Sequence, residues 1–307
     1  MTRFGAMKRW LSVPLLAIVA LALAACAGQP LDPAKRPLSM QAMHLLGKKG
    51  MDARASIFIR IFKEESELEV WKARADGRFY HFKTYPICNW SGGLGPKRKQ
   101  GDKQAPEGFY TVRAHQMNPN SKFHLSFNLG YPNRFDKSHR RTGNFLMVHG
   151  KCKSAGCYAM TDALMEEIYA LAREAFRGGQ KTIHVHAFPF RMTDANLERF
   201  RKHRWIGFWR ELKTGYDDFE LTRTPPKVAV CGRRYHVNVD FKLRSGAKLK
   251  ASAQCPRFER AKLVPFFPTN PTAQQLAKER VVAPGPKRRS FADIHRNAPR
   301  YGLTRAK

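Results

Sequence analysis

Three strand-like runs near the amino terminus follow one another too closely to be joined by crossovers, and this spacing constrains the fold more than any other feature. The runs cover residues 56–62, 68–74 and 78–85. Asp76 and Gly77, between the last two runs, supply the positive φ of a hairpin turn. Parallel neighbours would need a connection of about a dozen residues or more. The sequence therefore predicts an antiparallel meander.

The rest of the central region alternates further short strands with two helical patterns. Apolar residues recur at helical spacing over 161–176, where Thr161 or Asp162 can cap the helix. The second pattern begins with a helix at Thr193 and continues with a further helical piece that runs to about 213. The predicted class is mainly β with flanking helices. The further predicted strands cover residues 106–112, 124–129, 145–148 and 181–188.

Composition divides the chain into an export signal, a tether, the mainly β domain and a basic carboxy-terminal extension. The apolar run at the start follows basic residues and is too short to span a bilayer comfortably, which is typical of a secretory signal peptide. Pro225 and Pro226 mark a boundary, and the last part is Pro-rich and expected to be disordered. The predicted parts are a signal peptide at 1–25, a tether at 26–55 with a short helix near 40–46, the β domain at 56–222, a small β element at 223–262 and a basic tail at 263–307.

The end of the export signal resembles a bacterial lipobox, in which the cysteine is lipidated and becomes the first mature residue. Leu23, Ala24 and Ala25 precede Cys26, and all four positions fit the pattern. The alternative is an ordinary signal peptide whose cleavage site happens to precede a cysteine. Lipidation implies a periplasmic protein held by a lipid anchor. Because Ala27 is not an aspartate, the resemblance implies that the anchor lies in the outer membrane.

The net charge of +32 is extreme. Such a balance usually indicates nucleic acid, but an exported protein rarely meets any, so no nucleic-acid partner is expected. The polyanions available outside the cytoplasm are cell-wall carboxylates, phosphates and lipid headgroups. The charge is interpreted either as adhesion to the envelope or as a general basic bias without specific meaning. The loop around Lys97, Arg98 and Lys99 could meet carboxylates or simply face solvent.

The six cysteines leave an even number once one is assigned to lipid and one is kept as a reactive thiol. Exported chains tend to pair the remainder. Cys231 and Cys255 flank two strand-like runs and are the favoured disulfide. Cys88 and Cys152 might pair by elimination. A bond between Cys152 and Cys157 is the alternative, and it would consume the reactive thiol.

Neither a metal nor a cofactor is expected. The sequence has no Cys-x-x-Cys pair and no helix with paired histidines, so a zinc site is disfavoured. His184 and His186 lie on one face of a predicted strand, and such a pair could bind a metal. With no third ligand nearby, these two histidines are expected to pack as ordinary side chains.

The segment 145–157 carries the residues with the clearest chemical meaning. Its apolar run ends at His149 and Gly150, and a Ser-x-Gly-Cys turn follows, ending at Cys157. A thiol becomes a strong nucleophile only as a thiolate, and a neighbouring imidazole is the usual base. His149 is therefore the candidate proton acceptor and donor, and Cys157 the candidate nucleophile. Taken alone, His149 could be a core histidine and Cys157 half of a disulfide.

Two motifs together resemble the YkuD-type L,D-transpeptidase catalytic domain, and most closely its YafK-like branch. Residues 105–112 resemble the family's Thr-Pro-x-Gly-x-Phe strand, and residues 149–157 resemble its His-Gly … Ser-x-Gly-Cys signature. The run 125–133 also resembles that branch. The resemblance covers about 56–221. It implies a β-sandwich or barrel-like domain whose cysteine attacks a peptidoglycan stem peptide at the carbonyl of a diaminoacid residue.

The resemblance also implies roles for neighbouring residues. Backbone N–H groups of the turn would hold the oxyanion, since Gly156 lets the backbone approach closely. A backbone carbonyl near Gly150 or Lys151 would orient the imidazole. Solvated loop residues are the alternative for the contacts with substrate. The expected oxyanion or turn residues are Ser154, Gly150 and Gly156, and the expected substrate contacts are Asn128, Tyr131 and Tyr158.

Two departures from the family pattern limit the expected activity. The family continues Gly-Cys-Ile/Val-Arg, whereas Tyr158 and Ala159 follow the cysteine here, and the His-to-Cys gap is shorter. Both resemble the YafK-like branch, which is associated with detaching a lipoprotein from peptidoglycan. The expected function is cysteine-dependent action on stem peptides, by transfer or by hydrolysis that releases such a lipoprotein. A catalytically degenerate wall-binding module and a charge-driven adhesion lipoprotein are the alternatives.

Overall fold

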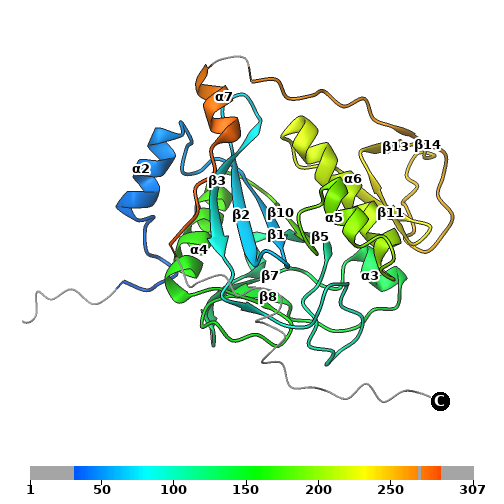
Figure 1. Cartoon of the computed structure of the whole chain (residues 1–307), viewed down its shortest axis with the longest axis horizontal. Helices are drawn as coiled ribbons and strands as arrows, with labels where there is room; N and C mark the ends of the chain where they lie inside the picture. The colour runs from blue at the N-terminus through cyan, green and yellow to red at the C-terminus, as the bar shows by residue number, and fades with distance from the viewer. Residues whose placement is uncertain (1–30, 269–270, 285–307) are drawn as a thin grey trace, which may run out of the picture.

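The structure is a computed structural model that describes residues 31–268 and 271–284. The predicted signal peptide, the predicted lipidation site Cys26 and the end of the predicted tail lie outside the described residues. Within the described part of the chain, no helix is long and apolar enough to cross a membrane. The fold is built around two β-sheets with helices beside them (Figure 1).

The first sheet contains the predicted meander. It consists of β1 (Ile57–Phe62), β2 (Glu67–Ala73), β3 (Phe79–Pro86), β5 (Gly108–Val112) and β10 (Ile183–Phe188), in the order β3-β2-β1-β10-β5. The pairs β1–β2 and β2–β3 are antiparallel, as their short connections require. Strand β10 joins β1 in parallel after a long excursion of the chain and pairs with β5 in antiparallel fashion. The meander predicted from the spacing is confirmed.

The second sheet is smaller and holds the segment with the His-Gly and Ser-x-Gly-Cys motifs. It consists of β4 (Asn89–Trp90), β6 (Met117–Ser121), β7 (His124–Asn128), β8 (Met147–His149) and β9 (Tyr158–Ala159), in the order β4-β9-β8-β7-β6. Only β8 and β9 run parallel; the other neighbours are antiparallel. The sequence predicted β7 and β8. It did not predict β4 and β9, which are too short to show any periodicity.

Helices α4 (Asp162–Arg177) and α6 (Ile206–Thr222) cover opposite faces of the first sheet. The predicted start of α4 is confirmed, because the Thr161 side chain accepts the N–H of Leu164. The helix predicted from Thr193 and the helical piece predicted after it are present as two helices, and α6 continues well beyond residue 213. The remaining helices are α2 (Met40–Lys48), α3 (Arg134–Ser138), α5 (Asp194–Arg199) and α7 (Pro271–Lys278), with a 3-10 turn at Ala114–Gln116.

Because both faces of the first sheet are covered, β1 is buried along its whole length. Its one charged side chain, Arg60, donates to Glu69 at 2.8 Å and to Glu220 at 2.7 Å. Its guanidinium also lies 4.7 Å from the centre of the Trp71 ring. A buried charge is tolerated only when it is paired and hydrogen-bonded in this way.

The segment predicted as a tether belongs to the folded body over its described residues, which corrects that prediction. The Ser39 side chain accepts the N–H of Ala42 and caps α2, so the short helix predicted near 40–46 is present. Ala42 and Leu46, one turn apart, are buried in the main core. The fully buried Lys49 ammonium donates to the carbonyl of His81 at 2.8 Å. This apolar stripe needs a partner, and the first sheet provides one.

Part of the predicted tail also returns to the first sheet, so the prediction of disorder is wrong for residues 271–284 (Figure 1, orange). The Thr84 N–H donates to the carbonyl of Val281, and the Ala283 N–H donates to the carbonyl of Thr84, each at 2.7 Å. Leu276 and Ala283 are buried in the main core. Strand β3 is an edge strand, and this pairing covers hydrogen-bonding groups that it would otherwise expose.

Between α6 and α7 the chain forms two small two-stranded sheets. One joins β11 (Val228–Cys231) to β12 (Arg234–Val237), and the other joins β13 (Val239–Phe241) to β14 (Phe258–Arg260). This element is not separate from the rest, because the ring of Tyr235 stacks on Phe135 with centroids 4.1 Å apart.

Candidate active site

His149 and Cys157 are brought together by two neighbouring strands of the second sheet. Strand β8 ends at His149, and Cys157 immediately precedes β9. The parallel register pairs His149 with Ala159, two residues after Cys157. Paired residues and alternate residues share a face, so the imidazole and the thiol leave the sheet from the same side. Ideal strand spacings separate their Cα atoms by about 8 Å, a distance that two side chains can bridge.

The His149 imidazole is buried and held in one orientation. Its Nδ1 lies 2.7 Å from the Gly150 carbonyl oxygen. A carbonyl only accepts, so Nδ1 carries the proton and Nε2 of the neutral ring is left with the lone pair. Burial lowers the pKa of His149, although the bond to Gly150 opposes that shift. A neutral ring with a free Nε2 is the form that a general base requires.

The Gly150 peptide is itself fixed by a residue that the sequence indicated only as a helix cap. The Asp162 carboxylate accepts the N–H of Lys151 at 2.7 Å, and the Gly150 N–H donates to the Phe123 carbonyl at 3.0 Å. A Cβ added to Gly150 would lie 2.5 Å from the Asp162 carboxylate oxygen, so only glycine fits. Asp162 thus holds the loop whose carbonyl orients His149. No carboxylate was predicted for such a role.

Ser154 organises the turn that ends at Cys157. Its Oγ accepts the N–H groups of Gly156 at 3.3 Å and of Cys157 at 3.2 Å, and donates to the Cys157 carbonyl at 2.7 Å. Gly156 has a φ of +116°, which a side chain rarely permits. Both N–H groups expected to hold an oxyanion therefore point at the Ser154 hydroxyl here. Oxyanion binding by these groups requires that hydroxyl to give way.

The Cys157 thiol is half-buried and unpaired. Burial raises its pKa, although the Met147 backbone N–H and the nearby charge of Lys97 oppose the shift. Its Sγ lies 3.6 Å from the Phe145 carbonyl oxygen. Burial thus favours the neutral form of both the thiol and the imidazole.

Disulfides join Cys88 to Cys152 and Cys231 to Cys255. The second is the pairing that the sequence favoured, the first is the one that it left open, and the rival bond between Cys152 and Cys157 is not formed. The first disulfide ties the loop between His149 and Cys157 to the start of β4, because Cys88 directly precedes that strand. The loop is therefore anchored at both Cys152 and Lys151.

Tyr158 was predicted to contact substrate, and the structure corrects this. The side chain is completely buried, and its hydroxyl donates to the carbonyl of Pro106. It therefore ties the turn with Cys157 to the strand that follows Pro106, which are the two motifs that carry the family resemblance. A residue in this position packs the site together and cannot reach a ligand in this conformation.

Tyr131 is likewise buried, which corrects its predicted substrate contact. Its hydroxyl donates to the carbonyl of Lys97 at 3.3 Å, and so it supports the basic loop from inside. Asn128 is half-buried and uses its side-chain oxygen to accept the N–H of Gly130 at 2.8 Å, which closes a turn. That turn leads into Tyr131.

Two exposed aromatic residues that the sequence did not single out stand beside the dyad. The ring of Phe123 lies 4.7 Å from the ring of His149, and Phe145 provides the carbonyl nearest the Cys157 thiol. Their side chains are 43% and 65% exposed, which is unusual for phenylalanine and suits contact with a ligand. Phe145 begins a strand predicted from the sequence, so nothing in the sequence sets its side chain apart. In the structure its backbone has a φ of +54°, which is uncommon for a residue other than glycine.

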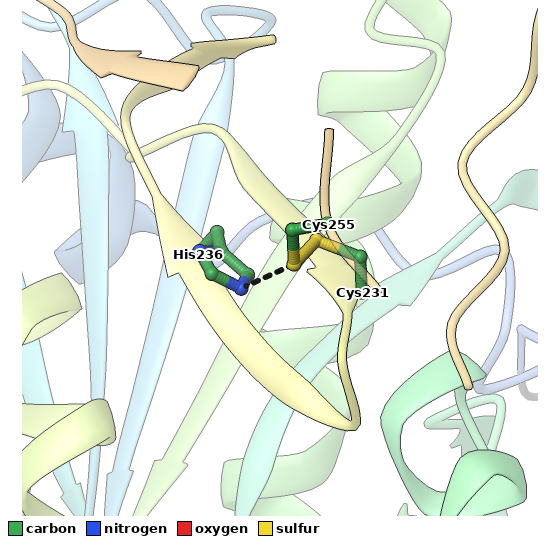
Figure 2. A group of neighbouring side chains, drawn as sticks. All are labelled: Cys231, His236 and Cys255. Atoms are coloured by element: carbon green, nitrogen blue, oxygen red, sulfur yellow. Dashed lines mark hydrogen bonds between the residues drawn. A yellow bond between two sulfur atoms is a disulfide. The ribbon is translucent and has the colours of Figure 1, made fainter. Parts of the chain in front are cut away.

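One cluster of metal-ligand residue types occurs among the described residues, formed by Cys231, His236 and Cys255. Figure 2 shows that the two sulfur atoms share a disulfide and that His236 Nε2 faces Cys255, at 3.1 Å. The disulfide leaves the imidazole as the only free ligand. His186 packs against the rings of Phe58 and Phe109 at 4.8 and 4.5 Å, as expected for an ordinary core side chain.

The sequence and this arrangement define a class of protein. Residues 58–185 match the model of the L,D-transpeptidase catalytic domain, and the chain belongs to this family of cysteine-dependent enzymes that act on peptidoglycan stem peptides. It is 44% identical over 182 residues to the Escherichia coli (strain K12) protein named "Putative L,D-transpeptidase YafK". That match covers 59% of this chain and 74% of the relative.

Among solved structures, the chain is similar to the helical cell shape determining protein Pgp2 from Campylobacter jejuni, at 19% identity and a TM-score of 0.35. That alignment covers 62% of this chain and 81% of the other. It is also similar to Bd1075 of Bdellovibrio bacteriovorus, at 20% identity and a TM-score of 0.31, over 54% of this chain and 61% of the other.

Proposed function

We propose that this protein acts on peptidoglycan stem peptides through an acyl-enzyme on Cys157, with His149 as the base. The observation that carries the proposal is the parallel pairing of β8 and β9, which brings the imidazole and the thiol to one face. The hydrogen bond from Nδ1 to Gly150 leaves Nε2 as the proton acceptor. These features supply a nucleophile, its base and a group that orients the base.

In the proposed reaction, Nε2 of His149 takes the Sγ proton as the Cys157 sulfur attacks the peptide carbonyl. The new C–S bond turns the carbonyl oxygen into an oxyanion. Collapse of this intermediate breaks the C–N bond, and the imidazolium returns its proton to the leaving amine. The acyl group then stays on sulfur as a thioester. An amine resolves it in transfer, and water resolves it in hydrolysis.

The proposed oxyanion donors are the N–H groups of Gly156 and Cys157. Both now donate to the Ser154 hydroxyl at more than 3 Å, which is long for such bonds. A negatively charged oxygen is a stronger acceptor than a hydroxyl, so it can compete for these donors. Ser154 would then keep its bond to the Cys157 carbonyl and maintain the shape of the turn.

Product analysis decides between transfer and hydrolysis. Purified sacculi incubated with the protein would be digested and analysed by mass spectrometry. A new cross-link or an exchanged terminal residue marks transfer, and a freed lysine amine from a wall-linked lipoprotein marks hydrolysis. Hydrolysis is the second candidate reaction. It is supported by Tyr158 and Ala159, which stand where cross-linking relatives of the family carry an apolar residue and an arginine.

The Cys157→Ala variant tests the proposal against its two alternatives. The proposal predicts that all product formation disappears while the fold is retained. A wall-binding module would keep binding sacculi and make no product in either form. Adhesion by charge alone would be lost in high salt and unaffected by the substitution, because salt screens exposed charges.

We further propose that the protein is exported to the periplasm and is anchored to the outer membrane by lipid on Cys26. The support is the basic and apolar start of the chain, the four lipobox-like positions and the absence of aspartate after the cysteine. Metabolic labelling with a radioactive fatty acid tests this. Label is expected in the wild-type protein and not in Cys26→Ser; equal labelling of both would contradict the proposal.

A further inference from the structure

A pocket of about 550 Å³ opens beside the loop that follows β4, and its wall is strongly basic. We call it the basic pocket. It is built from three separate stretches of chain, namely the loop 96–104, residues 139–141 after α3, and the two residues before α6. The lining residues that matter below are Arg98, Lys99, Gln104, Arg140, Arg204 and Trp205.

Four of the lining cations have no carboxylate partner among the described residues. These are Arg98, Lys99, Arg140 and Arg204, and the ion pairs found within 31–268 and 271–284 include none of them. The fifth lining cation, Arg141, is already paired with Asp136 at 2.8 Å. Unpaired cations gathered around a hollow attract anions, and the low-dielectric wall strengthens the attraction.

The one acid in the wall does not neutralise this charge. Asp102 is paired with the buried ammonium of Lys97 and accepts the backbone N–H groups of Arg98, Lys99 and Gln104. Its carboxylate therefore holds the shape of the loop, and its negative charge is balanced by Lys97. The ring of Trp205 supports two of the free cations, since the guanidinium groups of Arg204 and Arg98 lie 5.2 and 5.9 Å from its centroid.

The basic pocket adjoins the turn that carries Cys157. The carbonyl oxygen of Gln104 would lie 3.5 Å from a Cβ placed on Gly156, so the pocket wall and the turn are in contact. Ser91 lies between the same two parts, because its hydroxyl donates to the Lys103 carbonyl at 2.7 Å and its Oγ is 3.4 Å from Ser154 Oγ. A ligand that fills the pocket therefore lies next to the turn that ends at Cys157.

We propose that the basic pocket binds carboxylate groups of an acidic peptide whose neighbouring carbonyl is presented to Cys157. The proposal rests on the proposed function, because it takes the stem peptide as that acidic peptide. Arginine side chains suit the task, since their planar guanidinium groups match a carboxylate with two parallel hydrogen bonds. Four cations, three of them arginines, fit a peptide with several free carboxylates better than a neutral one.

Phosphate groups, free or on lipid headgroups, share this anionic chemistry and have to be distinguished. The contact between the pocket wall and the Gly156 turn favours the peptide. A substrate of the proposed reaction must lie next to this turn, whereas a membrane surface need not. In the peptide interpretation, affinity depends on carboxylates. In the phosphate interpretation, inorganic phosphate binds and the peptide does not.

The test measures binding by calorimetry with the mature full chain carrying Cys157→Ala, so that nothing is turned over. The probes are a stem tetrapeptide with free carboxylates, the same peptide with its carboxylates amidated, and inorganic phosphate. The variant Arg98→Ser/Arg204→Ser removes two of the free cations. The matched control, Arg54→Ser/Lys181→Ser, removes two exposed cations that do not line the pocket.

The free-acid peptide is expected to bind at least about fivefold more weakly to the pocket variant than to the control, and more weakly as salt rises. The amidated peptide is expected to bind weakly to both and to show no such difference. Equal affinities of the pocket variant and the control for the free-acid peptide would overturn the proposal. So would tight binding of phosphate that the pocket variant loses while peptide binding is unchanged.

The outcome is separable from that of the proposed function, because binding is measured without the thiol. Peptide affinity that depends on Arg98 and Arg204, in a protein that never forms an acyl-enzyme, would leave the pocket standing and remove the reaction. If instead the protein turns over stem peptides and its affinity for them does not depend on Arg98 or Arg204, the proposed reaction stands and the role of the pocket is removed.

Discussion

His149 is the residue whose surroundings set the pH dependence of the proposed reaction. Its ring is buried, which disfavours the charged form, and its one fixed hydrogen bond is to a neutral carbonyl. Among residues 31–268 and 271–284, no carboxylate is placed to stabilise an imidazolium through Nδ1. This differs from triads in which an aspartate takes that position and favours the charged ring.

We predict that the acid limb of the first-turnover acylation rate has its midpoint below pH 6.5, the ordinary pKa of histidine. Burial lowers the pKa of His149, so the base stays neutral as the pH falls through 6.5 and is protonated only further down. Rapid-quench measurements of acylation across pH check this. A midpoint above 6.5 would mean that the charged imidazole is stabilised by a group that the structure does not provide.

Asp162 is a positioning residue, and its removal is expected to slow acylation by about tenfold to a hundredfold through misplacement of the His149 ring. Asp162→Ala loses the acceptor for the Lys151 N–H, whereas Asp162→Asn keeps a side-chain oxygen there and is the matched control. The Ala variant should also shift the acid limb, because the Gly150 carbonyl is no longer fixed. Identical pH profiles for both variants and the wild type would contradict the role.

At the residue scale the sequence indicated His149, Cys157 and the Gly150 carbonyl, but not Asp162 or the packing roles of the neighbouring tyrosines. The types and order of His149 and Cys157 are local signals, and thiol chemistry has few alternatives. Tyr158 and Tyr131 were misjudged because an aromatic residue beside a site is equally suited to packing and to contact. Only the positions of Pro106 and Lys97, distant in sequence, decide that both tyrosines are buried.

At the element scale, the loop between β8 and β9 is held by the Cys88–Cys152 disulfide. It closes a loop with a sequence separation of 64, against 24 for Cys231–Cys255. Chain-entropy reasoning makes the two worth similar amounts, about 4.3 kcal/mol for the first and about 3.5 kcal/mol for the second. Their positions differ, since only the first lies in the loop that carries the candidate nucleophile.

We therefore expect Cys88→Ser/Cys152→Ser and Cys231→Ser/Cys255→Ser to lower the free energy of unfolding by similar amounts, about 4.3 and about 3.5 kcal/mol, in urea titrations. Only the first variant should also lose most of its acylation rate at a temperature where both are folded, because it alone releases the loop. Comparable losses of rate in the two variants would indicate that the loop does not depend on its disulfide.

Element prediction from sequence succeeded where the signal is local. The meander follows from short connections, and α4 follows from its apolar spacing and its Thr161 cap. Strands β4 and β9 could not be predicted, since two residues show no period and their pairing is decided by distant neighbours. The parallel β8–β9 pair, on which the dyad depends, is therefore a tertiary feature.

At the scale of the whole molecule, both ends of the described chain pack against the first sheet. Helix α2 packs from one end of the sequence, and α7 with residues 281–283 packs from the other. The compositional boundaries suggested loose ends here because polar and Pro-rich stretches often are. The few apolar residues within them, such as Leu46 and Leu276, were enough to dock.

We predict that truncation after residue 270 lowers the free energy of unfolding by about 2 to 4 kcal/mol, since it removes the buried Leu276 and two backbone hydrogen bonds to Thr84. Truncation after residue 284 keeps these contacts and is the matched control. Urea unfolding of the two forms checks this. The same midpoint for both would mean that the edge of β3 needs no cover.

The place where several of the positive charges gather is visible only in the folded structure. The sequence pointed to the loop around residues 97–99, but Arg140 and Arg204 are distant from it along the chain. The fold brings these cations to one hollow next to the turn with Cys157. Composition alone could suggest adhesion to the envelope; it could not locate the basic pocket.

The central claim is that Cys157 becomes acylated by a stem peptide with His149 as the base. The most direct measurement is intact-protein mass spectrometry after brief incubation with a stem tetrapeptide, using the wild type, Cys157→Ala and His149→Ala. The account predicts a thioester adduct on the wild type, none on Cys157→Ala and a greatly slowed adduct on His149→Ala. Product formation by Cys157→Ala, or an adduct on that variant, would contradict it.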